Sequence, residues 1–348
     1  MRNNKYDWSY LSKYRNSIYG IAIILIIAFH YFILVQKTEG IFATIARVYS
    51  FTIGSVGVDI FMIMSGVCLF YSLKRNPNVL EFYKKRCKRI IVPYIIVSFM
   101  FWYIRDIALE PLGTKRLIKD MTFYTFFTEG DRSLWYILAI MIVYLIYPLL
   151  FKIYDSLKKN SEIVTLLLIC VVIGFNYLID FYNADIYDNI EIMLERFPAA
   201  VLGAYLGKRV YNKEKIKLMD MGIVIVCVII NTIIDITRVC DIREVGMRVV
   251  RYTQIARGVV FIFLIVFIVD KISKKKIVEI LNKIGEYSLE LYLVHVTVLS
   301  VFKKIHMRNT KIICFLVYLV ITIGLVQGLR RLCDKIYGLL ENKKITQK

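Results

Sequence analysis

A titratable side chain lies inside the first long apolar run of this sequence. The run SIYGIAIILIIAFHYFILV extends from Ser17 to Val35 and contains His30. At about 1.5 Å per residue, a helix that starts at Ser17 places His30 roughly 20 Å into a bilayer. An ionisable group is costly at that depth, so His30 is a candidate for function. The alternative is a structural hydrogen bond to a neighbouring helix.

The second apolar run contains a single acidic residue, Asp59, within GSVGVDIFMIMSGVCLFYSLKR. A span over residues 50–73 that runs in the opposite direction places Asp59 about 14 Å below the far surface, at a level comparable with His30. A carboxylate at that level can orient an imidazole and stabilise the imidazolium, as in acyl-transfer triads. Alternatively, Asp59 bonds to backbone amides or pairs with a buried arginine. Close packing against a neighbouring helix is predicted by the small residues Gly54, Ser55, Gly57, Ser65 and Gly66.

A basic run follows the second apolar run and precedes the third. In FYKKRCKRIIVPY, Arg86 and Arg89 are three residues apart and share one face of a helix at the membrane boundary. The bidentate guanidinium group suits phosphates, so this pair is a candidate phosphate site. The alternative is electrostatic anchoring to anionic lipid headgroups.

Later runs add four polar or aromatic candidates. Trp135 opens the fourth run at the predicted membrane interface, and Arg196 follows Glu195 in the sixth, where an ion pair between the two is the simplest interpretation. Glu290 and His295 are five residues apart, so they point about 140° apart on a helix. His30 and His295 lack a convincing further ligand set, and we expect no metal site.

The composition identifies the elements that position these residues. Hydrophobic residues make up 58% of the 348 residues and the mean hydropathy is +0.59. Because a span takes about 20 apolar residues, the sequence predicts an all-α polytopic membrane bundle of about ten transmembrane helices. It forms a single domain over 1–348 with a membrane-embedded core over 17–340. The predicted spans are 17–36, 50–73, 90–108, 133–151, 162–180, 193–207, 219–236, 254–270, 284–302 and 311–330. The sixth is short and interrupted by Pro198, Gly203 and Gly207.

The charge distribution predicts the orientation of the bundle. The net charge of +20 arises from short basic clusters between the apolar runs, which argues against nucleic-acid binding. Most Lys and Arg fall on the side of the N-terminus, so both termini are expected in the cytoplasm. The longest loop on the other side, roughly 105–132, is expected to hold a short surface helix near LIKDMTFYTFF.

Six segments, taken in order, resemble the membrane acyltransferase-3 family over nearly the whole chain. They are IIAFH, GVDIFMIMSG, RCKRIIVP, SLWYILAIMIVYLIYPLL, RFPAAVLGAYLGK and YSLELYLVH. Members of this family are bacterial membrane acyltransferases of about ten helices that modify cell-surface glycans. The resemblance implies transfer of an acyl group from cytoplasmic acyl-CoA to a sugar hydroxyl of an extracytoplasmic polysaccharide or lipid-linked glycan. Acetyl-CoA is the expected donor, with succinyl-CoA as the alternative. It also implies a multi-pass protein of the plasma membrane whose partners are this acceptor glycan and membrane lipids.

The resemblance also assigns roles to the candidate residues. It implies that His30, oriented by Asp59, is the general base and that Arg86 and Arg89 hold the phosphates of CoA. The family's first helix usually carries Arg or Lys, then ten residues, then His. Here Tyr19 stands at the basic position and Arg15 lies one turn earlier. The acceptor site or a channel to it is expected to involve Ser65, Trp135, Arg196, Glu290 and His295. No cofactor besides the acyl-CoA substrate is expected.

A transporter is the competing class of function. Intramembrane His30, Asp59, Glu290 and His295 could form a proton relay in a proton-coupled exporter of a glycan or lipid-linked sugar. Such a protein typically has two inverted halves with matching broken helices. The sequence contains one interrupted span, and the other half has no counterpart.

Overall fold

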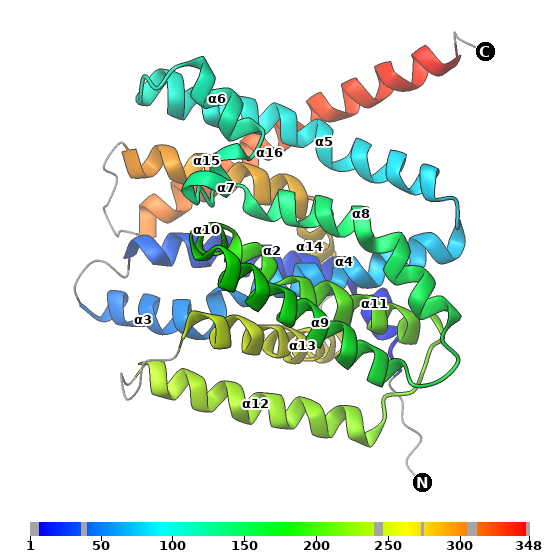
Figure 1. The fold of residues 1–348 in the computed structure, drawn as a ribbon. Helices are drawn as coiled ribbons and strands as arrows, with labels where there is room; N and C mark the ends of the chain where they lie inside the picture. Colours follow the sequence, from blue (N-terminus) through cyan, green and yellow to red (C-terminus); the bar gives the residue numbers. More distant parts are fainter. Residues whose placement is uncertain (1–6, 36–39, 240–245, 273–274, 305–311, 346–348) are drawn as a thin grey trace.

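The computed structural model describes residues 7–35, 40–239, 246–272, 275–304 and 312–345, which are almost entirely helical (Figure 1). Its first helices are α1 (Tyr10–Lys13), α2 (Arg15–Val35), α3 (Ile41–Tyr49), the π-helix η1 (Ser50–Gly54), α4 (Val56–Arg75), α5 (Val79–Tyr103), the π-helix η2 (Ile104–Leu109), α6 (Thr114–Met121), α7 (Tyr124–Glu129) and α8 (Trp135–Ser156). The later helices are α9 (Ser161–Tyr182), α10 (Ala184–Leu194), α11 (Phe197–Tyr211), α12 (Leu218–Val239), α13 (Met247–Lys271), α14 (Lys275–Glu286), α15 (Ser288–Lys304) and α16 (Ile312–Ile345).

Eight stretches of the described residues are long and apolar enough to cross a membrane. They are Arg15–Ile33, Ile41–Arg75, Val79–Leu109, Trp135–Ser156, Ser161–Tyr182, Leu218–Thr237, Met247–Lys271 and Cys314–Leu340. Two shorter helices, α11 with 15 residues and α15 with 17, correspond to the remaining predicted spans. A helix satisfies all its backbone hydrogen bonds internally, which hydrocarbon requires. The predicted polytopic all-α bundle is therefore confirmed.

The second span starts earlier than its predicted boundary at residue 50. Helix α3, η1 and α4 form a helical run from Ile41 to Arg75, interrupted only by a π-helical segment around Gly54. Neither a proline nor a capping side chain ends the helix before Val56. Because the run begins nine residues earlier, Asp59 lies deeper in the bundle than its position in the sequence indicated.

The interrupted sixth span is a pair of helices. Helix α10 ends at Leu194, and α11 begins at Phe197 with Pro198 in its first turn, where a proline needs no hydrogen-bond partner for its nitrogen. Pro198 therefore begins a helix instead of breaking one. Helices α6 and α7 lie in the 105–132 segment, as predicted for that loop.

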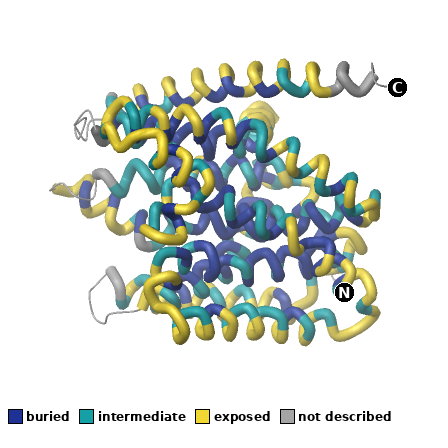
Figure 2. Tube along the Cα trace, turned by 45° about the horizontal axis from the view of Figure 1, so that its top comes forward, coloured by how far each residue is buried: buried dark blue, intermediate teal, exposed yellow. Residues whose placement is uncertain are grey.

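Helix α4 is the centre of the bundle and contacts α2, α8, α11 and α13. In its run 78% of the most apolar window is buried, compared with 11% in α9 and in α12, which therefore lie at the periphery. Figure 2 shows buried residues gathered at the middle of the bundle and exposed residues along its outer helices. At the α4–α11 crossing, a Cβ placed on Gly66 would lie 2.7 Å from the Cα of Gly203. The predicted close packing through small residues is found here.

We expect Gly203→Ala to lower the free energy of unfolding by about 1–3 kcal/mol, because overpacking forces backbone shifts. The added Cβ would lie 2.9 Å from the Cα of Gly66 and would also clash with the Ile63 carbonyl oxygen, neither of which can rotate away. Gly222→Ala is the matched control, because its Cβ would meet nothing within 4 Å. Thermal unfolding of both variants in detergent checks this. Equal melting temperatures would contradict tight packing at the α4–α11 crossing.

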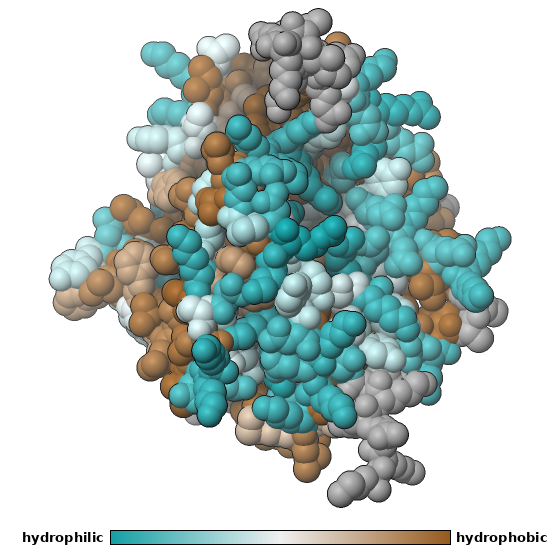
Figure 3. All heavy atoms as spheres, turned by 90° about the vertical axis from the view of Figure 1, so that its right-hand side faces the viewer, coloured by the Kyte–Doolittle hydropathy of each residue, from teal (hydrophilic) through white to brown (hydrophobic). Residues whose placement is uncertain are grey.

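The two ends of the bundle differ in character. We call the end that carries α1 and the α4–α5 connection the basic end, and Figure 3 shows hydrophilic side chains gathered over it with hydrophobic ones toward the edges. At the opposite end, Arg105 pairs with Asp106, Asp120 and Asp131, which ties α6 and the loop before α8 to η2. Burial acts to raise the pKa of Asp131, but hydrogen bonds from Ser133 and Arg105 hold it below its ordinary value. The Asp131 carboxylate therefore stays charged and paired.

Candidate active site

A cavity of about 790 Å³ opens at the basic end and extends into the bundle. We call it the basic cavity. Helices α1, α2, α4, α5, α8, α14, α15 and α16 contribute to its wall. Its volume falls within the range of small-molecule sites, roughly 300–1,000 Å³.

One stripe of α4 lines the basic cavity from its mouth to its inner end. The stripe consists of Phe61, Ser65, Cys68, Ser72 and Arg75, which follow one another at intervals of four and three residues. This spacing keeps them on one face of a helix. The stripe starts with a charged residue at the mouth, continues through small polar ones, and ends with an aromatic ring. The wall is therefore polar outside and apolar inside.

Arginines dominate the charge of the basic cavity. Its wall includes one acidic residue, Glu286, and the arginines Arg15, Arg75, Arg86, Arg89 and Arg330. Among the described residues, neither Arg75 nor Arg89 has a carboxylate partner within 4 Å. An excess of unpaired guanidinium groups at the mouth of a cavity favours an anionic ligand.

Arg86 is more enclosed than Arg75 and Arg89, because it is half-buried and the other two are exposed. Its guanidinium lies over the rings of Phe82 and Tyr144, with its central carbon 5.5 Å and 5.8 Å from the two ring centroids. Its Nε is buried and has no hydrogen-bond partner among the described residues. Stacking on two rings holds the group in place, so it can donate to a ligand without first being ordered.

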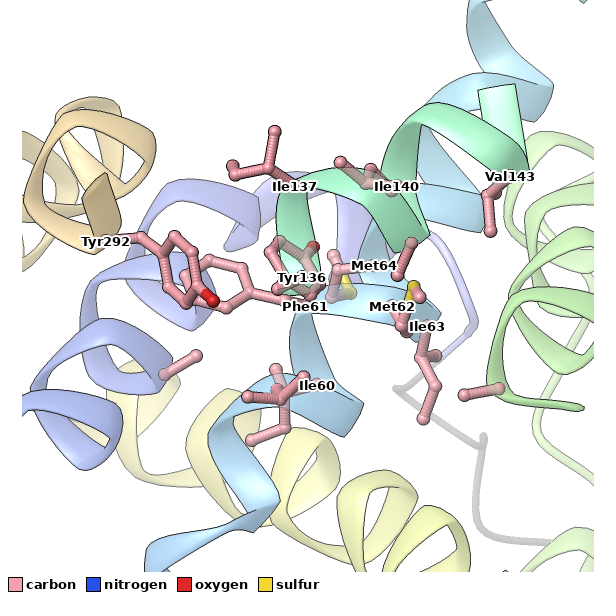
Figure 4. Packing of buried hydrophobic residues seen from close by; sticks show 14 of the residues in the cluster. Ile60, Phe61, Met62, Ile63, Met64, Tyr136, Ile137, Ile140, Val143 and Tyr292 are labelled. Carbon is pink, nitrogen blue, oxygen red and sulfur yellow. The ribbon is translucent and has the colours of Figure 1, made fainter. Parts of the chain in front are cut away.

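Three aromatic rings close the inner end of the basic cavity. Phe61, Tyr136 and Tyr292 all line it, and the ring centroids of Phe61 and Tyr136 are 6.0 Å apart while those of Tyr136 and Tyr292 are 5.1 Å apart. Figure 4 shows the three rings gathered where α4, α8 and α15 meet, with Met64 and Ile140 beside them. We call these three residues the aromatic constriction. On the mouth side, Tyr19 stacks on Phe61 at 5.4 Å.

The two described histidines lie together beyond the aromatic constriction. The ring of His295 is 5.5 Å from that of Tyr292 and 5.0 Å from that of His30, and neither histidine lines the basic cavity. His30 Nδ1 lies 2.9 Å from the Ile26 carbonyl oxygen, and His295 Nδ1 lies 3.0 Å from that of Leu291. A carbonyl only accepts, so in each neutral ring Nδ1 carries the hydrogen and Nε2 carries a lone pair. Both histidines are thus arranged to accept a proton at Nε2.

Asp59 pairs with Arg196 and not with His30. The Asp59 Oδ1 atom lies 3.5 Å from Arg196 Nε, and neither carboxylate oxygen accepts a hydrogen bond from the described residues. The sequence left three partners open for Asp59, namely the imidazole of His30, backbone amides and a buried arginine, and in the structure the partner is the buried arginine. Arg196 also lies over the ring of Trp135, at 5.2 Å from its centroid.

The depth of Asp59 explains this pairing. A Cβ on Gly54 would contact Phe29, and one on Gly57 would lie 2.6 Å from the Ala22 carbonyl oxygen, so α2 and α4 run antiparallel. In that register His30 lies level with Gly54, roughly 7 to 8 Å nearer the opposite end than Asp59. The two residues therefore differ in level, contrary to the expectation from sequence.

The adjacent residues Glu195 and Arg196 do not pair with each other. Glu195 Oε2 accepts a hydrogen bond from Arg251 at 2.6 Å, and Tyr187 donates to Glu195 Oε1 at 2.6 Å. The expected Glu195–Arg196 ion pair is therefore replaced by two separate buried pairs. Glu290 has a different partner again, Arg330 at 2.7 Å, at the rim of the basic cavity.

Apart from Glu290, which pairs with Arg330, the structure sorts the predicted residues into three groups. The five that line the basic cavity are Arg15, Tyr19, Ser65, Arg86 and Arg89. His30 and His295 form a pair beyond it, and Asp59, Arg196 and Trp135 form a buried cluster. The described residues contain no group of three or more His, Cys, Asp or Glu that could hold a metal ion.

Sequence reasoning missed Arg75, Arg330 and the aromatic constriction. A signal for two of these residues was present, because Arg75 and Phe61 share the helical stripe that contains Ser65. Tyr292 lies one helical turn before His295, which also places the two side chains on neighbouring parts of one face. No local signal connects Arg330 to the cavity, because α16 reaches it only through tertiary packing.

Comparison with known families adds the decisive observation. The family model described as an acyltransferase domain, Acyl_transf_3, matches residues 17–331, which is most of the chain. The chain belongs to the acyltransferase-3 family. The matched residues include both described histidines, the aromatic constriction and most of the wall of the basic cavity, whereas Ser12, Arg15 and Asn16 of that wall precede the match. The family also decides against the transporter that the sequence alone left open. No curated protein and no solved structure matches the chain.

Proposed function

We propose that this acyltransferase moves an acyl group, in the first place acetyl, from acyl-CoA in the basic cavity to a sugar hydroxyl of a cell-surface glycan. The observation that carries the proposal is the basic cavity, which combines unpaired arginines at its mouth with apolar rings at its inner end. Acyl-CoA has the matching polarity, with phosphates at one end and a small neutral thioester at the other. In this proposal the basic end faces the cytoplasm of a bacterial cell and the protein is embedded in the plasma membrane.

The donor is proposed to bind with its phosphates between Arg86 and Arg89, with Arg15 opposite them on α2. The pantetheine arm then extends along the α4 stripe toward Phe61, at the inner end of the cavity. The rings there favour an acetyl group over a succinyl group, because they supply no positive charge to pair with the free carboxylate of a succinyl group.

His30 is the proposed general base. The acceptor hydroxyl gives its proton to Nε2 of His30 while its oxygen forms a bond to the thioester carbonyl carbon. The carbon–sulfur bond then breaks, the sulfur takes the proton from the imidazolium, and CoA leaves as the free thiol. The ester remains on the sugar. The hydrogen bond from Nδ1 to Ile26 supports this role, because it leaves the lone pair at Nε2.

Arg86→Ala and Arg89→Ala are each expected to weaken CoA binding about tenfold to a hundredfold, since each removes a charge-assisted hydrogen bond to phosphate. Lys84→Ala is the matched control, because Lys84 is an exposed cation on the same helix that does not line the cavity. Titration of CoA against protein in nanodiscs measures the change. Equal affinities for the three variants would contradict the phosphate site and favour the alternative role in anchoring to lipids.

The function itself is tested on cells. A deletion strain is complemented with the wild type or with His30→Ala at matched membrane expression, and O-acetyl groups on the purified surface glycan are measured by NMR. We expect the acetyl signal to return with the wild type and to be absent with the variant. Deletion without any loss of acyl groups from the glycan would contradict the proposed acceptor class.

A further inference from the structure

We propose that the aromatic constriction sets the upper length of the acyl chain, so that Phe61, Tyr136 and Tyr292 determine donor specificity. This inference rests on the proposed function, because it takes the basic cavity as the acyl-CoA site. The inference names the residues that select the acyl group, and the family match does not identify such residues.

The first argument comes from the shape of the cavity. The arginines lie at the mouth and the three rings at the far end, so a CoA held by its phosphates directs its acyl group toward the rings. All three side chains of the constriction are nearly buried, with exposures of 5%, 6% and 4% for Phe61, Tyr136 and Tyr292. Ring centroids 5.1 and 6.0 Å apart leave no room for an alkyl chain between them.

The second argument comes from what lies beyond the constriction. The Tyr292 ring contacts His295, whose Nε2 is buried without a partner among the described residues. Arg196 and Asp59 follow, and although they form an ion pair at 3.5 Å, Arg196 Nε and both Asp59 oxygens make no hydrogen bond to the described residues. An alkyl chain that passed the rings would cover these polar groups without offering them a hydrogen bond. Longer acyl chains are therefore disfavoured both by the rings and by the polar groups behind them.

The position of the rings relative to the histidines fits a short acyl group. Among acyl groups held against Tyr292, acetyl brings its carbonyl nearest to the histidine pair, because the Tyr292 ring lies 5.5 Å from that of His295, which lies 5.0 Å from that of His30. Each added methylene must either push the rings apart or hold the carbonyl back toward the mouth. Length is thus coupled to how closely the reacting carbon approaches the histidine pair.

Binding of a donor series to the wild-type protein in nanodiscs tests the proposal without a known acceptor. We expect CoA and acetyl-CoA to bind with similar affinity, and hexanoyl-CoA to bind about tenfold or more weakly than acetyl-CoA, as overpacking of a filled core would cause. Phe61→Leu and Tyr292→Leu are expected to reduce this difference to about threefold or less, because each replaces a ring with a smaller side chain.

Tyr144→Leu is the matched control, because it removes a ring from the same cavity near Arg86 instead of at the inner end. It should change the affinity for all donors alike and leave the difference between acetyl-CoA and hexanoyl-CoA as in the wild type. Melting temperatures verify that each variant is folded, and the two constriction variants test the proposal independently.

Three results would overturn the inference. Equal affinity of the wild type for acetyl-CoA and hexanoyl-CoA would show that the rings impose no limit on length. A difference that persists in folded Phe61→Leu and Tyr292→Leu would assign the limit to other residues. Failure of CoA itself to bind would overturn the proposed donor site and the length limit together. The other two results would overturn only the length limit and would leave the donor site in place.

Discussion

Replacing His30 with glutamine is expected to lower the rate of acyl transfer about 10²- to 10⁴-fold, the usual contribution of a general base. Glutamine occupies a similar volume and can still donate to the Ile26 carbonyl, but its amide does not accept a proton near neutral pH. The measurement is the initial rate of incorporation of labelled acetyl groups into glycan by membranes that contain equal amounts of protein. Affinity for CoA should be unchanged, because His30 does not line the basic cavity.

Ile24→Ala provides the control on the same helix. Its side chain is 43% exposed on the outer surface of α2, so truncation leaves both the cavity and the histidine pair intact. We expect transfer close to the wild-type rate for this variant. Wild-type rates for His30→Gln as well would exclude His30 as the base and would direct attention to His295, which has the same Nδ1 hydrogen bond to its own helix.

Replacing Arg196 with methionine is expected to destabilise the protein by about 3–5 kcal/mol, because it leaves the Asp59 carboxylate buried and unpaired. Asp59 is fully buried and Arg196 is 5% exposed, so water cannot replace the lost partner. Thermal unfolding in detergent measures the effect. The melting temperature should fall well below that of the wild type.

The double variant Asp59→Leu/Arg196→Met separates stability from chemistry. Replacing both members of a buried ion pair with apolar residues is often neutral, so we expect most of the stability to return. If the pair serves only to hold α4 against the start of α11, transfer should return with it. A folded double variant that transfers no acyl group would assign the pair a direct part in the reaction. A single variant as stable as the wild type would show that the pair contributes nothing to folding.

The class of fold was predictable because a bilayer restricts the choice of structure. An apolar run in hydrocarbon must satisfy its backbone hydrogen bonds internally, as a helix does, and the described residues of the ten predicted runs are almost entirely helical. The boundaries were less predictable. Nothing local ends the helix at residue 50, and whether Pro198 breaks a helix or begins one depends on the residues packed around it.

The sequence indicated which single residues are candidates for function, but it did not indicate which of them lie together in the structure. An intramembrane histidine, a lone carboxylate and two arginines on one face stand out in the sequence, and the structure places both arginines on the wall of one cavity. The partner of Asp59 could not be deduced, because its level relative to His30 depends on the register between α2 and α4. That register is set by contacts such as those of Gly57 with Ala22.

The sequence by itself determined the helical membrane fold, the family and the residues worth testing, because hydropathy and short motifs are local properties of the chain. Only the tertiary structure decided which of these residues meet. It placed His30 beside His295, paired Asp59 with Arg196, and closed the basic cavity with rings from α4, α8 and α15. The physical reason is that side chains far apart in the sequence come into contact only through the packing of whole helices, and the packing angle and register depend on all the contacts together.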